Sequence, residues 1–260
     1  MKQRILLSAV LAIVGGVFAH AESQADAIMR VSYDLPQPAT LQATMYMLLV
    51  DRGGSQNLRV LSTYRKKVEG GTDSYTVFLS PPDVKGTKFL SLATKEGEDV
   101  QRIWLPELRR VRRIAGGSKG DTFVGSDLTY YDMSTHRFSD ATYALHGADT
   151  LQVVQDGVKN EVPCWVVDSV PRDQSVPYGK TRVWVGKQDS FIYRSTMWDK
   201  NGNELKTVYI LEVANRDGII VPIKTGVVTN GGHKTLLQMS DVVLNEPIDP
   251  ALFTIANLQR

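Results

Sequence analysis

Residues 116–120 read Gly-Gly-Ser-Lys-Gly, which matches the G-x-S-x-G pattern that presents a serine nucleophile in one class of hydrolases. That chemistry needs a base, and His136, His146 and His233 follow along the chain. The pattern also needs a buried apolar strand before the serine and a helix directly after it, among alternating strands and helices. The residues before this motif are instead the arginine-rich run 109–113, so the pattern favours a flexible loop over a catalytic serine.

The histidines and one cysteine are the other side chains that could bind a metal or react. His136 and His146 are ten residues apart and His233 is distant, so no pair has the spacing typical of a zinc site. Cys164 lies in the run Val-Pro-Cys-Trp-Val-Val, where no basic neighbour would activate its thiol. A single cysteine also excludes an intramolecular disulfide and an iron–sulfur cluster. We therefore expect no metal, no cofactor and a buried, unreactive thiol.

Four arginines gather in a short stretch of the chain, at positions Arg109, Arg110, Arg112 and Arg113. Guanidinium groups bind phosphates and carboxylates well, so the cluster could dock on lipid head groups or on an acidic partner. A solvated strand edge whose charge prevents aggregation explains the cluster equally well. On a strand, the four side chains would divide two and two between the faces.

The overall composition excludes two broad classes of protein. Of 260 residues, 42% are hydrophobic and 22% are charged, which is typical of a globular chain and not of a disordered one. Lysine and arginine number 30 against 28 aspartates and glutamates, for a net charge of +2. A nucleic-acid-binding protein normally shows a much larger basic excess, so we expect no nucleic acid partner.

The first twenty-one residues have the pattern of a secretory signal peptide. Lys2 and Arg4 form a basic start, residues 5–18 are an apolar run, and Ala19-His20-Ala21 is a small-x-small cleavage site. The run is shorter than the roughly 20 residues that span a bilayer, and no cysteine follows it to carry a lipid anchor. We expect cleavage after Ala21, and a soluble single domain, 22–260, in a bacterial periplasm.

The rest of the chain is a series of short β-type runs that follow a helix-compatible segment, 23–31. The runs are 43–51, 58–69, 74–80, 88–93, 101–105, 164–169, 181–185, 191–198, 205–213, 219–228 and 235–244. Eleven such runs predict an antiparallel sheet or barrel. In 58–69, apolar side chains alternate with Arg59, Arg65 and Lys67, which predicts that the basic parity faces solvent.

Two of the runs, 43–51 and 191–198, carry apolar side chains on both parities. Each of their faces must therefore be covered. A sandwich, a sheet packed by helices and a curved sheet around an apolar cavity all satisfy this requirement.

The segment 116–133 interrupts the β pattern. It begins with glycines and then becomes rich in large apolar residues, namely Phe123, Leu128, Tyr130, Tyr131 and Met133. We expect a mobile loop followed by a short helix that Ser126 or Asp127 caps. Because aromatic side chains are rarely left in water, this loop should fold over a core or a bound ligand.

Several stretches together resemble the LolA-like family of periplasmic outer-membrane lipoprotein-sorting proteins. Three long ones carry the resemblance: FLSPPDVKGTKFL at 78–90, WLPELRRVRRI at 104–114 and FVGSDLTYYD at 123–132. Shorter matches are Trp184-Val185, 198–202, 252–254 and Asn257-Leu258. All of them follow the family's order over essentially the whole chain after the leader.

The resemblance implies an open, strongly curved antiparallel sheet, an incomplete barrel, with short helices over its apolar concave face. It also implies that the protein is not an enzyme, but a periplasmic carrier of lipid or lipoprotein acyl chains that touches membranes transiently. An inner-membrane exporter is the partner associated with this branch. A non-catalytic adaptor that docks on such an exporter, or on an envelope assembly, is the alternative.

Site residues follow partly from the resemblance and partly from parity. The aromatic segment Phe123 to Met133 matches the family's glycine-serine-aspartate motif, so it corresponds to the lid or its support. Strand parity proposes a cavity lined by Met45, Met47, Leu49, Tyr75, Val77, Phe191, Tyr193, Met197 and Tyr209. The family's carrier closes its lid with an arginine, a role that the resemblance assigns to no residue here.

Overall fold

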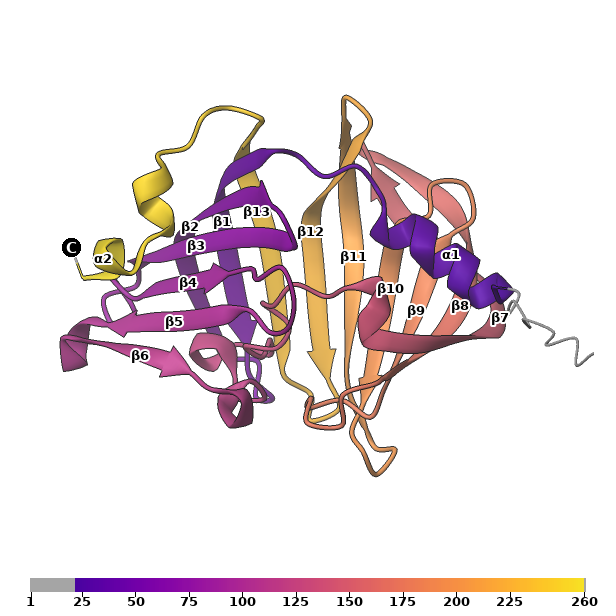
Figure 1. Cartoon of the computed structure of the whole chain (residues 1–260), viewed down its shortest axis with the longest axis horizontal. Coiled ribbons are helices and arrows are strands. Elements are labelled where there is room, and N and C mark those ends of the chain that lie inside the picture. Colours follow the sequence, from indigo (N-terminus) through magenta and orange to yellow (C-terminus); the bar gives the residue numbers. More distant parts are fainter. Residues whose placement is uncertain (1–21, 260) are drawn as a thin grey trace, which may run out of the picture.

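One curved sheet of thirteen strands forms the body of the computed structural model, which describes residues 22–259 (Figure 1). The strands are β1 (Thr40–Val50), β2 (Gln56–Val68), β3 (Gly71–Ser80), β4 (Lys88–Leu92), β5 (Val100–Leu105), β6 (Arg110–Ile114), β7 (Ala141–Gln155), β8 (Val158–Pro171), β9 (Lys180–Gly186), β10 (Ile192–Trp198), β11 (Glu204–Arg216), β12 (Ile219–Thr229) and β13 (Lys234–Leu244). Their spatial order is β10-β9-β8-β7-β11-β12-β13-β1-β2-β3-β4-β5-β6.

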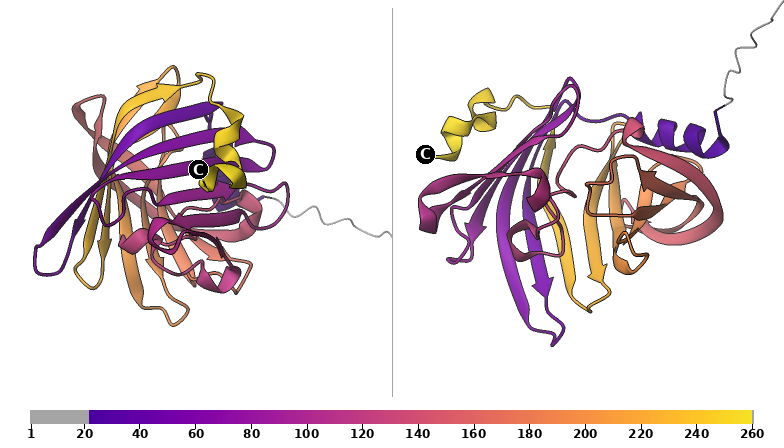
Figure 2. Two further views of the ribbon diagram at one scale, coloured as in Figure 1. Left: turned by 90° about the vertical axis from the view of Figure 1, so that its left-hand side faces the viewer. Right: turned by 60° about the horizontal axis from the view of Figure 1, so that its bottom comes forward.

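Strands β7 to β11 close on themselves, whereas the remainder of the sheet stays open. β10 pairs with β11 antiparallel, and β11 also pairs with β7 over a short parallel stretch. From β12 to β6 the sheet curls around without closing, as the two views of Figure 2 show. The predicted mainly β fold, an open and strongly curved sheet, is confirmed.

All eleven predicted runs are strands, and two further strands were not predicted. β7 offers little apolar periodicity, because most of its side chains between Thr142 and Gln152 are exposed. β6 consists largely of exposed arginines, and only Ile114 is buried. In both strands, pairing with a neighbouring strand and not an apolar face holds the extended backbone.

The helix expected over 23–31 is present as α1 (Gln24–Tyr33). Ser23 and Asp26 form a capping box, in which the Asp26 amide donates to Ser23 Oγ at 3.1 Å. The helix buries Ala25 and Met29 against β7 and β9, in a cluster with Val183 and Val185. α1 therefore covers the closed part of the sheet, which consists of strands β7 to β11 (Figure 1). Within residues 22–259, no helix is long and apolar enough to cross a bilayer.

Strand register defines which residues share a face. Met47 is the partner of both Leu237 and Arg59, and Leu61 pairs with Phe78. Residue pairs that lie directly opposite on neighbouring strands project to the same side, so these residues line one face, which is concave. Tyr75 and Leu90 line the convex face.

A C-terminal segment covers the convex face of β3 and β4. The turn η5 (Pro250–Phe253) and the short helix α2 (Ile255–Leu258) bury Phe253 and Leu258 against Tyr75 and Leu90. In Figure 1 this yellow segment lies beside β2, β3 and β4, at the end of the molecule remote from α1. Each face of the sheet therefore has its own cover.

Residues 115–140 cross the concave side without forming the helix expected after Ser126. They contain three single turns of 3₁₀ helix, η2 (Gly116–Ser118), η3 (Phe123–Gly125) and η4 (Phe138–Asp140). Ser126 Oγ donates to the Phe123 carbonyl oxygen and does not cap a helix. We call residues 123–133 the lid.

Candidate functional site

The lid packs on an apolar floor to which six strands, β1 to β6, contribute side chains. The floor and the lid together form one buried cluster that contains Met47, Leu61, Phe78, Val84, Phe89, Ile103, Ile114, Phe123 and Tyr130. The Phe123 ring meets Phe89 edge-on at a centroid distance of 5.1 Å and Tyr130 at 5.8 Å. Such aromatic pairs stabilise packing beyond the area they bury. The lid side chains thus occupy the concave space that was expected to be a hollow.

Arg59 holds the front of the lid from β2. Its guanidinium donates to the carbonyl oxygen of Val124, and the side chain is only 8% exposed. Val124 has a φ of 48°, a left-handed conformation that is unfavourable for a β-branched residue. Burial lowers the pKa of Arg59, and a charged donor in such a place forms a strong hydrogen bond.

A buried ion pair holds the middle of the lid to β11. Lys206, itself buried, donates through Nζ to Asp132 and, at 2.9 Å, to the carbonyl oxygen of Asp127. Tyr178 donates to the other carboxylate oxygen of Asp132 at 2.7 Å, and its pKa is raised by burial and by that carboxylate. Asp127 in turn accepts from Thr235 Oγ1 on β13 at 2.7 Å.

Two residues of the β4–β5 side hold the far end. Gln101 Nε2 donates to the Tyr130 carbonyl oxygen at 2.9 Å, and Asp99 accepts from the Thr135 amide at 2.7 Å. The lid is therefore attached to both sides of the curved sheet by polar contacts, while its apolar side chains face the floor.

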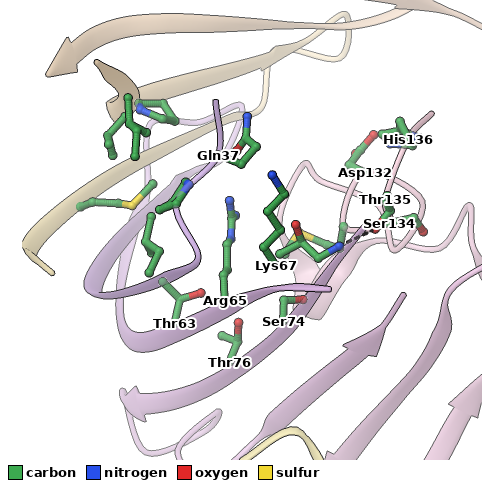
Figure 3. Close-up of a pocket in the computed structure, with 18 of the residues that line it drawn as sticks. Gln37, Thr63, Arg65, Lys67, Ser74, Thr76, Asp132, Ser134, Thr135 and His136 are labelled. Carbon is green, nitrogen blue, oxygen red and sulfur yellow. Dashed lines mark hydrogen bonds between the residues drawn. The ribbon is translucent and has the colours of Figure 1, made fainter. Parts of the chain in front are cut away.

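Cavities remain on either side of the lid. One of 340 Å³ lies above β2 and β3 and reaches β12 and β13 (Figure 3). A second, of 190 Å³, lies beneath α1 and is lined by Met29, Tyr33, Tyr178 and Met197. Both volumes border on Asp132 and His136, so the lid and the residues that follow it separate the two spaces.

The structure places four of the residues proposed for the cavity on the concave face. Met45, Met47 and Leu49 lie in or against the lid–floor cluster, and Met197 lines the cavity beneath α1. All five lid residues, Phe123, Leu128, Tyr130, Tyr131 and Met133, are buried or half-buried. Four of them contact the floor cluster, and Tyr131 stacks edge-on with Tyr178 at 5.6 Å.

The other five proposed residues do not lie with them. Tyr75 and Val77 belong to the convex face and contact the C-terminal segment. Phe191 and Tyr193 pack with Trp184 on the face that is turned away from α1, where Tyr209 also lies, in contact with Arg194. Tyr193 shares parity with Met197 in the sequence, but a bulge between Ile192 and Arg194 shifts it to the other face.

The arginine cluster lies at the open edge of the sheet and is exposed. Arg112 is the partner of Ile103 and faces the concave side, whereas Arg113 pairs with Arg102 on the convex side. Arg110 shares the concave parity, and Arg109 precedes the strand in a left-handed conformation. The expected two-and-two division therefore changes, because only three of the four arginines lie on the strand.

The serine, cysteine and metal-ligand candidates have surroundings that do not favour a reaction or metal binding. Among the described residues, the Ser118 hydroxyl has one hydrogen-bond partner, the Arg112 guanidinium at 3.4 Å. Cys164 is fully buried, and burial raises the pKa of its thiol to about 12. Residues 22–259 contain no group of three potential ligands that could hold a metal ion.

Sequence reasoning missed the residues that attach the lid. The basic parity of β2 was expected to face water, but it faces the concave interior, where it contains Arg59 and Arg65. Leu58, on the opposite parity, is 52% exposed. A polar residue in the middle of a strand is the only local indication, and it cannot tell a solvated face from a polar wall inside a curve.

A family model whose description reads only "Uncharacterized protein" matches residues 70–260, most of the chain. Among curated proteins, no sequence matches.

Solved structures are similar over nearly the full length. One is described as an outer membrane lipoprotein-sorting protein domain from Vibrio parahaemolyticus, with 25% identity, a TM-score of 0.82, and coverage of 91% of this chain and 98% of that one. A DUF1329 family protein from Desulfovibrio piger has 26% identity and a TM-score of 0.78, covering 90% and 96%. A LolA superfamily protein from Nitrosomonas europaea, at 18% identity and a TM-score of 0.67, covers 90% and 98% and shares the fold.

Proposed function

The chain belongs to the family of that model and, with it, to the LolA-like proteins, and from this premise we propose that it is a periplasmic carrier of lipid or lipoprotein acyl chains. The lid is the observation that best supports the proposal. Its aromatic side chains pack on the apolar floor, and hydrogen bonds from Lys206 and Gln101 hold its backbone. An acyl chain could take the place of these side chains once those hydrogen bonds open.

The energetics of carriage explain why such a cover is useful. Each CH₂ group of an acyl chain costs about 0.8 kcal/mol to expose to water, so a long chain needs an apolar site during transit. An empty apolar site has the same problem, because its own surface would face water. The lid of the free protein covers the floor, and its displacement lowers the net affinity enough for cargo to be released.

We assign the arginine edge, Arg109 to Arg113, to docking against an acidic surface, either a membrane or a partner. Its exposure and its position at the open edge of the sheet support this role. An adaptor that docks through this edge without carrying cargo is the competing function, and the presence or absence of bound lipid separates the two.

Lipid content provides the first test. We expect the protein purified from its own periplasm to release lipid on organic extraction, detected by mass spectrometry, and the delipidated protein to bind a fluorescent fatty acid. Closing the lid should block this uptake. The pair Asp127→Cys and Thr235→Cys places two thiols where the side chains already touch, and Cys164 is too buried to interfere.

The oxidised double variant should not take up the probe, and reduction should restore binding, whereas each single variant serves as a control. A protein that yields no lipid and never binds the fatty acid would favour the adaptor. Equal uptake by the oxidised and reduced forms would show that the lid does not cover the site.

A further inference from the structure

The 340 Å³ cavity has two chemically different walls. Leu41, Val221 and Met239, from β1, β12 and β13, form an apolar wall. The opposite wall is the part of β2 and β3 that lines the cavity, where the side chains are hydroxyls and cations, namely Thr63, Arg65, Lys67, Thr72, Ser74 and Thr76. Figure 3 shows Arg65 and Lys67 extending from this wall into the open space. Its volume is within the usual range of ligand sites, about 300–1,000 Å³.

The polar wall is supplied with hydrogen-bond donors that the protein does not use. Within residues 22–259, the Arg65 guanidinium forms neither a hydrogen bond nor an ion pair, and Lys67 forms no ion pair. In the same part of the chain, the hydroxyls of Thr63, Ser74 and Thr76 have no protein partner, although Thr63 and Thr76 are buried residues. Arg65 is partly buried between neighbouring strands, and this burial lowers its pKa.

The charge in this cavity is not balanced by the carboxylate that borders it. Asp132 already accepts from Lys206 and Tyr178, so its charge is used in the attachment of the lid. Among residues 22–259, the half-buried guanidinium of Arg65 therefore has no carboxylate partner in this cavity, and the exposed Lys67 lies beside it. A half-buried guanidinium without a protein partner can donate charge-assisted hydrogen bonds to an anionic ligand.

We propose that this cavity binds an acidic amphiphile, whose carboxylate or phosphate head group contacts Arg65 and whose hydrocarbon lies on the wall of Leu41, Val221 and Met239. The guanidinium can donate two parallel hydrogen bonds to either anion, and the neighbouring hydroxyls of Thr63 and Thr76 provide further donors. The inference rests on the proposed carrier function. It narrows the cargo from acyl chains in general to those with a negatively charged head group.

A matched pair of ligands tests the inference on the unmodified protein. Palmitic acid and hexadecanol have the same chain and differ in the charge of the head group, and both affinities are measurable by displacement of a fluorescent probe. We expect palmitate to bind about tenfold more tightly, the size of one charge-assisted hydrogen bond. Equal affinities would overturn the inference and leave the carrier function intact. Binding of neither ligand would contradict the carrier function itself.

Variants test whether Arg65 causes the preference for palmitate over hexadecanol. Arg65→Gln should weaken palmitate binding about tenfold and leave hexadecanol unchanged, whereas Arg65→Lys should retain part of the preference. Lys66→Gln is the control, since Lys66 is adjacent on β2 but projects to the other face. Unchanged palmitate affinity in Arg65→Gln, in protein whose circular dichroism matches wild type, would show that the anion binds elsewhere.

The source of the anion is the final question. Vesicles of phosphatidylglycerol and of phosphatidylcholine compare an acidic with a zwitterionic phosphate, and preferential extraction from the former supports a phospholipid head group. Preference for palmitate alone supports a carboxylate. Inorganic phosphate that binds as tightly as palmitate, and equally through Arg65, would overturn the assignment to an amphiphile, because the apolar wall would then contribute nothing.

Discussion

Two basic side chains on the concave face of β2 have different surroundings. Arg59 and Arg65 lie six residues apart on β2 and project to the same side. Arg59 is bound to the lid through Val124, while Arg65 lines the 340 Å³ cavity and has no partner among residues 22–259. One guanidinium is therefore hydrogen-bonded to the lid, and the other is the one that we propose to contact an anion.

The Arg59 contact leads to a prediction about lid opening. Arg59→Met should increase hydrogen exchange of the amides around Val124 and Gly125 about tenfold or more, because a charge-assisted bond contributes roughly 1.5–3 kcal/mol. Exchange measured by mass spectrometry checks this. Arg113→Met, at the exposed edge, should leave lid exchange unchanged. If both variants exchange like the wild type, then packing of the aromatic residues alone holds the lid.

At the scale of elements, the lid is held by side chains from several strands that are far apart in the chain. Lys206 comes from β11, Tyr178 precedes β9, and Thr235 begins β13, so three distant segments meet at Asp127 and Asp132 of the lid. Closure of β7 to β11 gives β11 a defined place, and the lid is attached to it there.

The buried pair is expected to show strong coupling. Lys206→Met and Asp132→Asn should each destabilise the fold by about 3 kcal/mol, since each leaves an uncompensated buried group. The double variant should lose clearly less than the sum, because the second change removes the charge that the first left unpaired. Urea denaturation of the four proteins measures the coupling. Additive losses would indicate that the two side chains act independently.

For the whole molecule, the two faces of the sheet are covered by different segments of the chain. The concave face carries the lid and the cavities, whereas the convex face of β3 and β4 is sealed by the C-terminal segment. Phe253 is 8% exposed in that contact, while Ile255 beside it is 41% exposed. The segment therefore contributes stability on one side without touching the candidate site on the other.

This separation is testable with one pair of variants. Phe253→Ala should destabilise the protein by about 3 kcal/mol, and Ile255→Ala by less than about 0.5 kcal/mol. Neither should alter fatty-acid affinity, because the segment covers the face opposite the cavity. Thermal or urea unfolding and probe titration supply both values. A loss of affinity in folded Phe253→Ala would show that the two faces are coupled.

The sequence by itself was sufficient for much of the local structure. Alternating apolar residues and turn residues located eleven strands, and the segment 23–31 was recognised as compatible with a helix, which is α1 in the structure. The segment of lid residues, Phe123 to Met133, was also recognisable from its composition, because aromatic side chains need an apolar surface. These features depend on neighbours within a few residues.

Only the tertiary structure decided which side of each strand faces inward. A period of two defines two faces but does not say which one becomes concave, so Tyr75 and Arg65 were assigned to the opposite faces from those they occupy. A bulge between Ile192 and Arg194 also placed Tyr193 on the face opposite to Met197, although the two residues have the same parity in the sequence. Curvature arises from strand twist and from pairings such as β11 with β7, whose residues are more than fifty positions apart in the chain. Such contacts leave no mark in a local pattern.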